Sequence, residues 1–202
     1  MTAIALIDYG AGNLASVKKA FAAIGAEIFV PQGPEDIERA SAVVVPGVGH
    51  FGATRVLAGA WADAIAARVG EGRPLLGICL GMQWLFEGSD EAPDCPGLGV
   101  VAGRCYRLGN GMRDNLKVPH VGWNSLELTR ESALLDGVPP GAQVYFTHSF
   151  AAPISGYTLA VTEHGERFAS IVQRANVAGV QFHPEKSGEA GLTLLRNFVR
   201  LC

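Results

Sequence analysis

Short apolar runs alternate with segments of helical periodicity through the first half of the chain. The runs cover residues 4–8, 27–30, 42–45 and 75–78, and apolar residues at helical spacing follow the first, third and fourth of them. Strands joined by helical crossovers form a parallel sheet with helices on both faces. This alternation is the pattern that most restricts the possible folds.

The second half of the chain changes character and indicates an antiparallel extension. We expect strands with hairpin-like connections over residues 99–108, 121–128, 143–150, 159–162 and 170–173, and a final buried strand over residues 177–182. We expect helices ending near Gly25, over residues 54–69, through Met82, Leu85 and Phe86, and over residues 192–201. The prediction is one α/β domain over residues 1–202, with a mostly parallel central sheet.

Composition and charge exclude several classes of protein. The net charge is −3 and no run of Lys and Arg is present, which argues against a nucleic-acid binder. The first residues lack the basic segment of a signal peptide, and no apolar stretch reaches about 18 residues. The four cysteines show no C-x-x-C spacing, and no zinc-ligand spacing is present, so we expect a reduced, cytoplasmic protein without a metal.

Residues 10–15, Gly-Ala-Gly-Asn-Leu-Ala, fit the glycine pattern of a dinucleotide-binding turn. Such a site also needs an acid about 20 residues after the first glycine, to hold the ribose. That position falls on residues 30–33, Val-Pro-Gln-Gly, and the first acid, Glu35, comes later. The glycines are therefore interpreted as a tight strand-to-helix turn, and no cofactor is predicted. Asn13 is left unexplained at the sheet edge where α/β sites lie.

Residues 77–81, Gly-Ile-Cys-Leu-Gly, connect a buried strand to a helix. This is the cysteine version of the G-x-S-x-G nucleophile elbow, in which glycines let the backbone turn sharply at the nucleophile. A helix start beside the sulfur favours thiolate over thiol. An isolated cysteine is more often a packed structural residue. The elbow context makes Cys79 the predicted nucleophile.

A nucleophilic cysteine needs a base, and the base needs a group that orients it. His183 follows the last predicted strand, and Glu185 lies two residues later, where it can accept a hydrogen bond from the imidazole. His50 has no acid placed to orient it, and the remaining histidines are interpreted as hydrogen-bonded structural groups or turn residues: His120, His148 and His164.

Acyl transfer also needs donors for an oxyanion. The backbone N–H of Leu80, directly after the nucleophile, supplies one. The loop Pro46-Gly47-Val48-Gly49 follows the third strand, and its glycines permit the backbone conformations that a second donor requires.

Together these motifs resemble a class I, triad-type glutamine amidotransferase. The resemblance rests on residues 77–81 with Gln83, and on His183 with Glu185. Within that class, residues 46–49, residues 117–124 (Lys-Val-Pro-His-Val-Gly-Trp-Asn) and residues 181–187 (Gln-Phe-His-Pro-Glu-Lys-Ser) are similar to the glutaminase subunits of imidazole glycerol phosphate synthase. The similarity covers essentially the whole chain.

The resemblance implies hydrolysis of glutamine through a cysteine thioester. Ammonia then passes to a separate (β/α)8 cyclase subunit that makes imidazole glycerol phosphate, for histidine, and an aminoimidazole carboxamide ribotide, for purines. It implies the following roles: Cys79, His183 and Glu185 as the triad; Val48 and Leu80 as oxyanion donors, with reorientation of the Val48 peptide in the active state; Gly47, Gln83 and Glu91 as glutamine contacts; and Asn13, Tyr145 and Lys186 facing the cyclase.

Two other interpretations stay open at this stage. The chain could serve a different synthase, such as anthranilate or pyridoxal phosphate synthase, although residues 117–124 and Lys186-Ser187 weigh against it. It could also be a non-catalytic binding subunit that kept the fold, which the intact elbow and the His183–Glu185 pair disfavour. His50 and Phe150 depart from the family pattern, and neither departure touches the triad.

Overall fold

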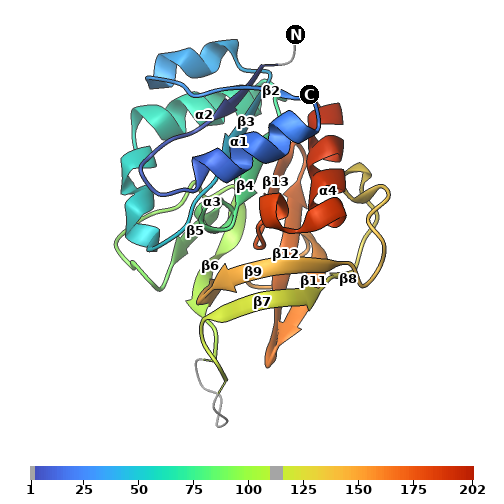
Figure 1. The fold of residues 1–202 in the computed structure, drawn as a ribbon. Coiled ribbons are helices and arrows are strands. Elements are labelled where there is room, and N and C mark those ends of the chain that lie inside the picture. The colour runs from blue at the N-terminus through green and yellow to red at the C-terminus, as the bar shows by residue number, and fades with distance from the viewer. Residues whose placement is uncertain (1–2, 110–115) are drawn as a thin grey trace.

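The computed structural model describes residues 3–109 and 116–202, and an eight-stranded sheet runs through its centre (Figure 1). The strand order is β2-β1-β3-β4-β13-β12-β11-β8. The strands that pair in parallel are β1 (Ala3–Leu6), β2 (Glu27–Phe29), β3 (Ala42–Val45), β4 (Leu75–Ile78) and β13 (Val177–Val180). The antiparallel extension consists of β12 (Glu166–Arg174), β11 (Thr158–His164) and β8 (Glu127–Leu128). This arrangement confirms the predicted fold class.

Helices cover both faces of the central sheet. On one face lie α1 (Leu14–Ala23) and α4 (Gly188–Arg200) (Figure 1). Phe21 of α1 and Phe198 of α4 are buried in the same apolar cluster. On the other face, α2 (Ala60–Gly70) and α3 (Leu80–Trp84) bury Ile65 and Trp84. In the described part of the chain, four 3-10 helices join these elements: η1 (Pro34–Arg39), η2 (Phe51–Leu57), η3 (Ala133–Leu135) and η4 (Pro184–Lys186).

Two smaller sheets stand beside the central one. The first joins β10 (Phe150–Ala151), β6 (Val101–Arg107) and β5 (Phe86–Ser89), and the second pairs β7 (His120–Ser125) with β9 (Gln143–His148). Side chains alternate along β9, so that Phe146 packs into the core while Tyr145 points outward. The outward face of β7 exposes Val121 and Trp123.

The structure corrects two of the predicted helices. The helix expected over residues 54–69 is divided into η2 and α2, because Gly59 has a φ of 68°, which a continuous α-helix does not contain. The helix expected to include Leu85 and Phe86 ends at Trp84, and Phe86 begins β5. A short run of apolar residues is compatible with both a buried helix and a buried strand, so the apolar pattern did not show where α3 ends and β5 begins.

None of the helices in the described part of the chain has the length and hydropathy needed to cross a membrane.

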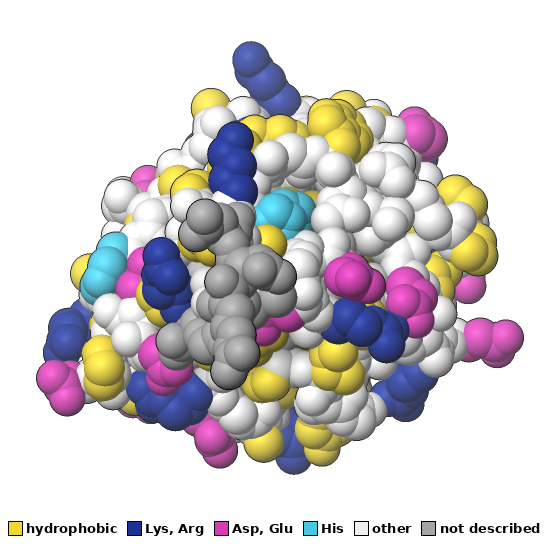
Figure 2. Space-filling view, turned by 90° about the horizontal axis from the view of Figure 1, so that it is seen from below, with side chains coloured by type: hydrophobic (Ala, Val, Ile, Leu, Met, Phe, Trp, Pro, Cys, Tyr) yellow, Lys and Arg dark blue, Asp and Glu magenta, His cyan; other side chains and the backbone are white. Residues whose placement is uncertain are grey.

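The lower end of the molecule in Figure 1 faces the viewer in Figure 2. Acidic and basic side chains are interspersed there with hydrophobic ones, and no broad field of one charge is visible on that face.

Candidate active site

Cys79 occupies the sharp turn between β4 and α3. Its φ of 53° and ψ of −105° place a non-glycine residue in a rarely populated backbone region. The turn is packed closely: a Cβ on Gly81 would lie 1.8 Å from the Val45 carbonyl oxygen, and a Cβ on Gly77 would lie 2.5 Å from the Gly81 carbonyl oxygen. The Cys79 N–H donates to the Val180 carbonyl at 2.7 Å. The two glycines are therefore required for the turn.

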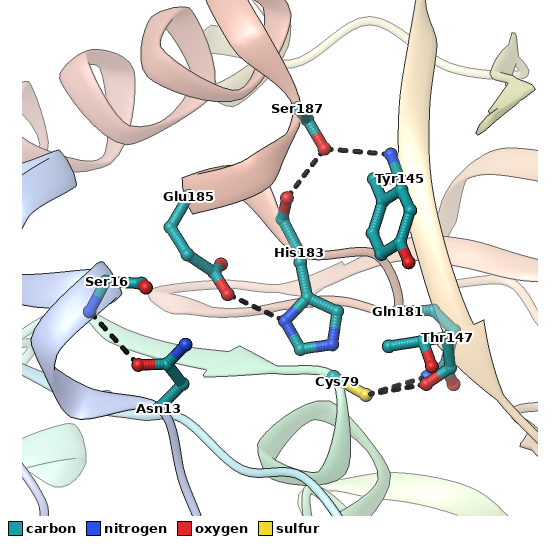
Figure 3. Close-up of polar contacts among 9 residues, drawn as sticks. All are labelled: Asn13, Ser16, Cys79, Tyr145, Thr147, Gln181, His183, Glu185 and Ser187. Carbon is teal, nitrogen blue, oxygen red and sulfur yellow. Dashed lines mark hydrogen bonds and ion pairs between the residues drawn. The ribbon is translucent and has the colours of Figure 1, made fainter. Parts of the chain in front are cut away.

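His183 and Glu185 follow β13, the neighbour of β4, and meet Cys79 at the same edge of the sheet (Figure 3). Nδ1 of His183 lies 2.8 Å from Oε1 of Glu185, and both side chains are buried. Burial alone would lower the pKa of His183, but contacts with the Cys79 thiol and the Glu185 carboxylate outweigh it and raise the pKa to about 10. This arrangement favours the imidazolium form of His183.

Ser187 fixes the turn that carries His183, and the sequence reasoning assigned it no role. Its hydroxyl donates to the His183 carbonyl at 2.6 Å and accepts from the Tyr145 N–H at 3.0 Å (Figure 3). The His183 N–H donates in turn to the Tyr145 carbonyl at 2.9 Å. Strand β9 therefore holds the backbone that carries His183, the predicted base.

Gln181, like Ser187, was given no role from the sequence. It contacts the predicted nucleophile. Its fully buried side chain donates from Nε2 to the Cys79 Sγ at 3.7 Å. The Gln181 Oε1 accepts from Nε2 of Gln83 at 3.1 Å, and the same nitrogen donates to the Phe150 carbonyl at 2.8 Å. Gln83, predicted to contact glutamine, thus uses its amide donors to hold Gln181 in this arrangement.

The Phe150 carbonyl, which accepts from Gln83, also ends a hydrogen-bonded row of histidines. Nδ1 of His148 lies 2.8 Å from the Phe150 carbonyl, Nδ1 of His120 lies 3.0 Å from Nε2 of His148, and Nδ2 of Asn124 lies 3.3 Å from Nε2 of His120. Because a carbonyl only accepts, His148 donates from Nδ1, and the row then runs in one direction with both imidazoles neutral. The interpretation of these histidines as hydrogen-bonded structural groups is confirmed.

A cavity of about 270 Å³ opens beside Cys79. Its wall includes Gly49, Leu80, Gln83 and Glu91, together with residues from the end of β9 to the start of β10, Thr147, His148, Ser149 and Phe150. Glu91 also accepts the Phe51 N–H at 2.7 Å, which fixes its carboxylate at the cavity wall. The space suits a small molecule with a charged end.

Both predicted oxyanion donors are already hydrogen-bonded. The Leu80 N–H points to the Gly47 carbonyl oxygen at 3.3 Å, and the Val48 N–H donates to the Ala11 carbonyl oxygen at 2.9 Å. The Gly47 carbonyl and the Val48 N–H belong to one peptide group. That single peptide therefore blocks one donor and turns the other away from the cavity.

The residues predicted to face a partner lie on the surface beside the triad. Asn13 is exposed and caps α1, since its Oδ1 accepts the Ser16 N–H at 3.3 Å (Figure 3). Tyr145 stands next to Lys186, whose Nζ lies 5.6 Å from the centre of the tyrosine ring. His50 caps η2 by accepting the Gly52 N–H at 3.0 Å.

Within the described residues, no group of three or more His, Cys, Asp and Glu side chains is placed to hold a metal ion.

The sequence contained a signal for Gln181 and Ser187, because both fall in the run around His183 that carries the family resemblance. Assigning their roles needed the geometry, since spacing alone does not show which side chain reaches the sulfur.

The histidine row predicts a loss of stability in acid. Burial lowers the pKa of His148 to about 3, and burial together with His164 lowers the pKa of His120 to about 4. An unfolded histidine titrates near 6.5, so below that pH the unfolded chain binds more protons and stability falls as pH falls. His148 alone should cost about 2 kcal/mol of unfolding free energy between pH 7.5 and pH 5.

Urea denaturation of the wild type and of His148→Gln between pH 7.5 and pH 5 measures this loss. The variant should start less stable, because a partner of His120 is altered, and should then lose less stability on acidification. Between pH 7.5 and pH 8.5 the two proteins should differ by a constant amount. Equal acid losses in both proteins would contradict a neutral, buried His148.

Comparison with known proteins agrees with this geometry. Residues 5–202 match the family described as "Glutamine amidotransferase class-I". The chain is 44% identical to "Imidazole glycerol phosphate synthase subunit HisH" of Pyrococcus furiosus, over 100% of both chains. It is 46% identical to the protein of that name from Salinibacter ruber, over 97% of this chain and 93% of the relative.

Solved structures show the same fold at lower identity. The "Structure of PurLQS from Thermotoga maritima" superposes with a TM-score of 0.75 at 17% identity, covering 98% of this chain and 97% of that one. A "Crystal structure of glutamine amidotransferase" gives a TM-score of 0.74 at 23% identity, with 98% and 97% covered. The chain belongs to the class I glutamine amidotransferase family and, within it, to the imidazole glycerol phosphate synthase subunits HisH.

Proposed function

We propose that Cys79, His183 and Glu185 hydrolyse glutamine to glutamate and ammonia, and that the ammonia is delivered to the cyclase subunit of imidazole glycerol phosphate synthase in histidine biosynthesis. The observation that carries this proposal is a strained cysteine elbow beside a buried His–Glu pair. The family and the names of the full-length relatives supply the substrate and the pathway.

In the proposed reaction the Cys79 sulfur attacks the side-chain amide carbon of glutamine. His183 gives its proton to the departing nitrogen, so ammonia leaves and a γ-glutamyl thioester remains. The neutral imidazole then takes a proton from water, whose oxygen attacks the thioester and releases glutamate and the thiolate. Glu185 keeps Nδ1 of His183 protonated and oriented throughout.

Both chemical steps pass through an oxyanion, which needs donors aimed at the cavity. We propose that Leu80 and Val48 supply them after the Gly47–Val48 peptide rotates by about half a turn. That rotation would release the Leu80 N–H and bring the Val48 N–H to the same side. Each donor contributes about 10²–10³-fold in rate, so the arrangement described above is a resting state of low activity.

Glutamine recognition is proposed for the cavity wall. Glu91 is placed to pair with the substrate ammonium from its fixed position beside Phe51. A side chain on Gly47 would meet the Tyr9 hydroxyl, so glycine there leaves room for the loop and the substrate. Gln83 contributes from the cavity wall while its amide holds Gln181.

The proposed partner is the (β/α)8 cyclase subunit, docked on a surface that includes Asn13 and the outward face of β7 and β9. Trp123 is 57% exposed and Val121 is 56% exposed, an unusual pair of large apolar side chains on neighbouring outward positions. The Trp123 ring packs edge-on against Tyr145, with 6.1 Å between ring centres, and Lys186 lies beyond it. This strip adjoins the triad, where ammonia is released.

A cytoplasmic location is also proposed. The four cysteines, all within the described residues, are free thiols. Free buried thiols are typical of a reducing compartment.

Replacing the nucleophile tests the proposed function. Cys79→Ala should reduce glutamate release from glutamine by at least about a thousandfold, because the thioester cannot form. Assayed with the cyclase subunit, the variant should keep full cyclase turnover when ammonia is supplied directly. Cys202→Ala, which removes a half-buried thiol outside the cavity wall, should retain glutaminase activity. Glutaminase activity that survived Cys79→Ala would overturn the assignment.

Asn13 combines a helix cap with a proposed partner contact, and two substitutions separate these roles. Asn13→Ala removes both, whereas Asn13→Ser keeps a capping oxygen and removes the amide. Only the alanine variant should lose about 1 kcal/mol of unfolding free energy. Both variants should bind the cyclase more weakly or transfer ammonia less efficiently, measured by titration calorimetry and by glutamine consumed per cyclase product. Wild-type affinity and coupling in Asn13→Ser would reduce Asn13 to a helix cap.

A further inference from the structure

The hydroxyl of Tyr9 is enclosed beside the loop that blocks the oxyanion site. Tyr9 follows β1, and its hydroxyl oxygen is buried without a hydrogen-bond partner. A Cβ placed on Gly47 would lie 2.1 Å from that oxygen, so the hydroxyl rests against the Gly47 α-carbon. Burial and the charge of nearby Cys79 raise the pKa of Tyr9, so the group stays a protonated donor at every ordinary pH.

An enclosed hydroxyl without a partner is uncommon, because it gave up its hydrogen bonds to water and gained none in return. The Ala11 carbonyl oxygen is also close to Gly47: it would lie 3.3 Å from a Cβ placed on that glycine. That carbonyl already accepts the Val48 N–H. Tyr9 therefore faces the Gly47–Val48 peptide with a donor that this arrangement does not use.

Rotation of the peptide would change what Tyr9 faces. The Val48 N–H leaves the Ala11 carbonyl and joins the Leu80 N–H, while the Gly47 carbonyl oxygen turns the opposite way. It then loses the Leu80 N–H as donor and points toward the Ala11 carbonyl oxygen, which repels it. The rotated loop needs a hydrogen-bond donor on that side, and Tyr9 is the side chain already in contact with Gly47.

We propose that Tyr9 is a positioning residue for the oxyanion loop, and that its hydroxyl donates to the Gly47 carbonyl oxygen when the Gly47–Val48 peptide has rotated. The proposal rests on the proposed glutaminase function and extends it. Tyr9 is unpaired in the resting arrangement and paired in the active one. It therefore shifts the equilibrium toward the arrangement in which both backbone donors face the substrate.

Tyr9→Phe removes the hydroxyl and keeps the ring. Losing one hydrogen bond from the active arrangement should lower kcat for glutamine hydrolysis about five- to tenfold and leave KM unchanged. Alkylation of Cys79 by iodoacetamide should proceed at the wild-type rate, because displacement at a saturated carbon forms no oxyanion. The melting temperature should stay level or rise, since the resting structure loses an unpaired buried hydroxyl.

The measurements use the chain alone and in complex with the cyclase, and Tyr157→Phe, a tyrosine outside the cavity wall, is the matched control with wild-type kcat. Unchanged kcat in Tyr9→Phe would overturn the proposal. So would a parallel fall in kcat, alkylation rate and melting temperature, which would mark Tyr9 as a packing residue. The proposed function fails separately, if the wild type releases no glutamate or if Cys79→Ala still does.

Discussion

The backbone turn at Cys79 is the constraint on which the rest of the site depends. A φ of 53° raises the conformational energy of a cysteine, and Cys79 keeps it because the surrounding backbone contacts hold the turn in place. Strand β13 accepts the Cys79 N–H through Val180, and the Val45 carbonyl lies against Gly81 from the other neighbouring strand. The sheet that holds this turn also brings His183 to it, because β13 and β4 end at the same edge. The same parallel pairing therefore builds the sheet and brings the residues of the predicted triad together.

Polar contacts then connect the predicted nucleophile to the surface strand β7. From Asn124 the row of donors passes through two neutral histidines to the Phe150 carbonyl. Gln83 donates to the same carbonyl and to Gln181, which reaches the Cys79 sulfur. Every link is buried or partly buried and hydrogen-bonded, so the wall of the cavity and the proposed docking face are held by one network. A shift of β7 on partner binding has a direct physical route to the cavity.

Much of this architecture could be predicted from the sequence, because the relevant signals are local. Runs such as residues 42–45 and 75–78 gave the strand boundaries, and the glycines around Cys79 gave the elbow. His183 and Glu185 lie two residues apart, so their contact needed no long-range information. The family resemblance added the partner and the substrate.

The remaining features depend on contacts between distant segments. No local pattern shows that Gln181 reaches the sulfur or that Gln83, 98 residues away in sequence, orients it. The family resemblance implied that the Val48 peptide must reorient, but only the structure shows which carbonyl meets the Val48 N–H and which meets the Leu80 N–H. Leu85 and Phe86 were assigned to a helix because apolar residues carry no periodicity over so short a span.

Catalysis by Cys79 requires a covalent glutamyl intermediate on its sulfur. The most direct measurement is mass spectrometry of the chain, mixed with the cyclase and glutamine and quenched in acid during turnover, followed by peptide mapping. A glutamyl adduct should appear on the peptide that contains Cys79, and hydroxylamine should remove it as it removes a thioester. Turnover of glutamine with no adduct, or with an adduct confined to Cys95, Cys105 or Cys202, would contradict it.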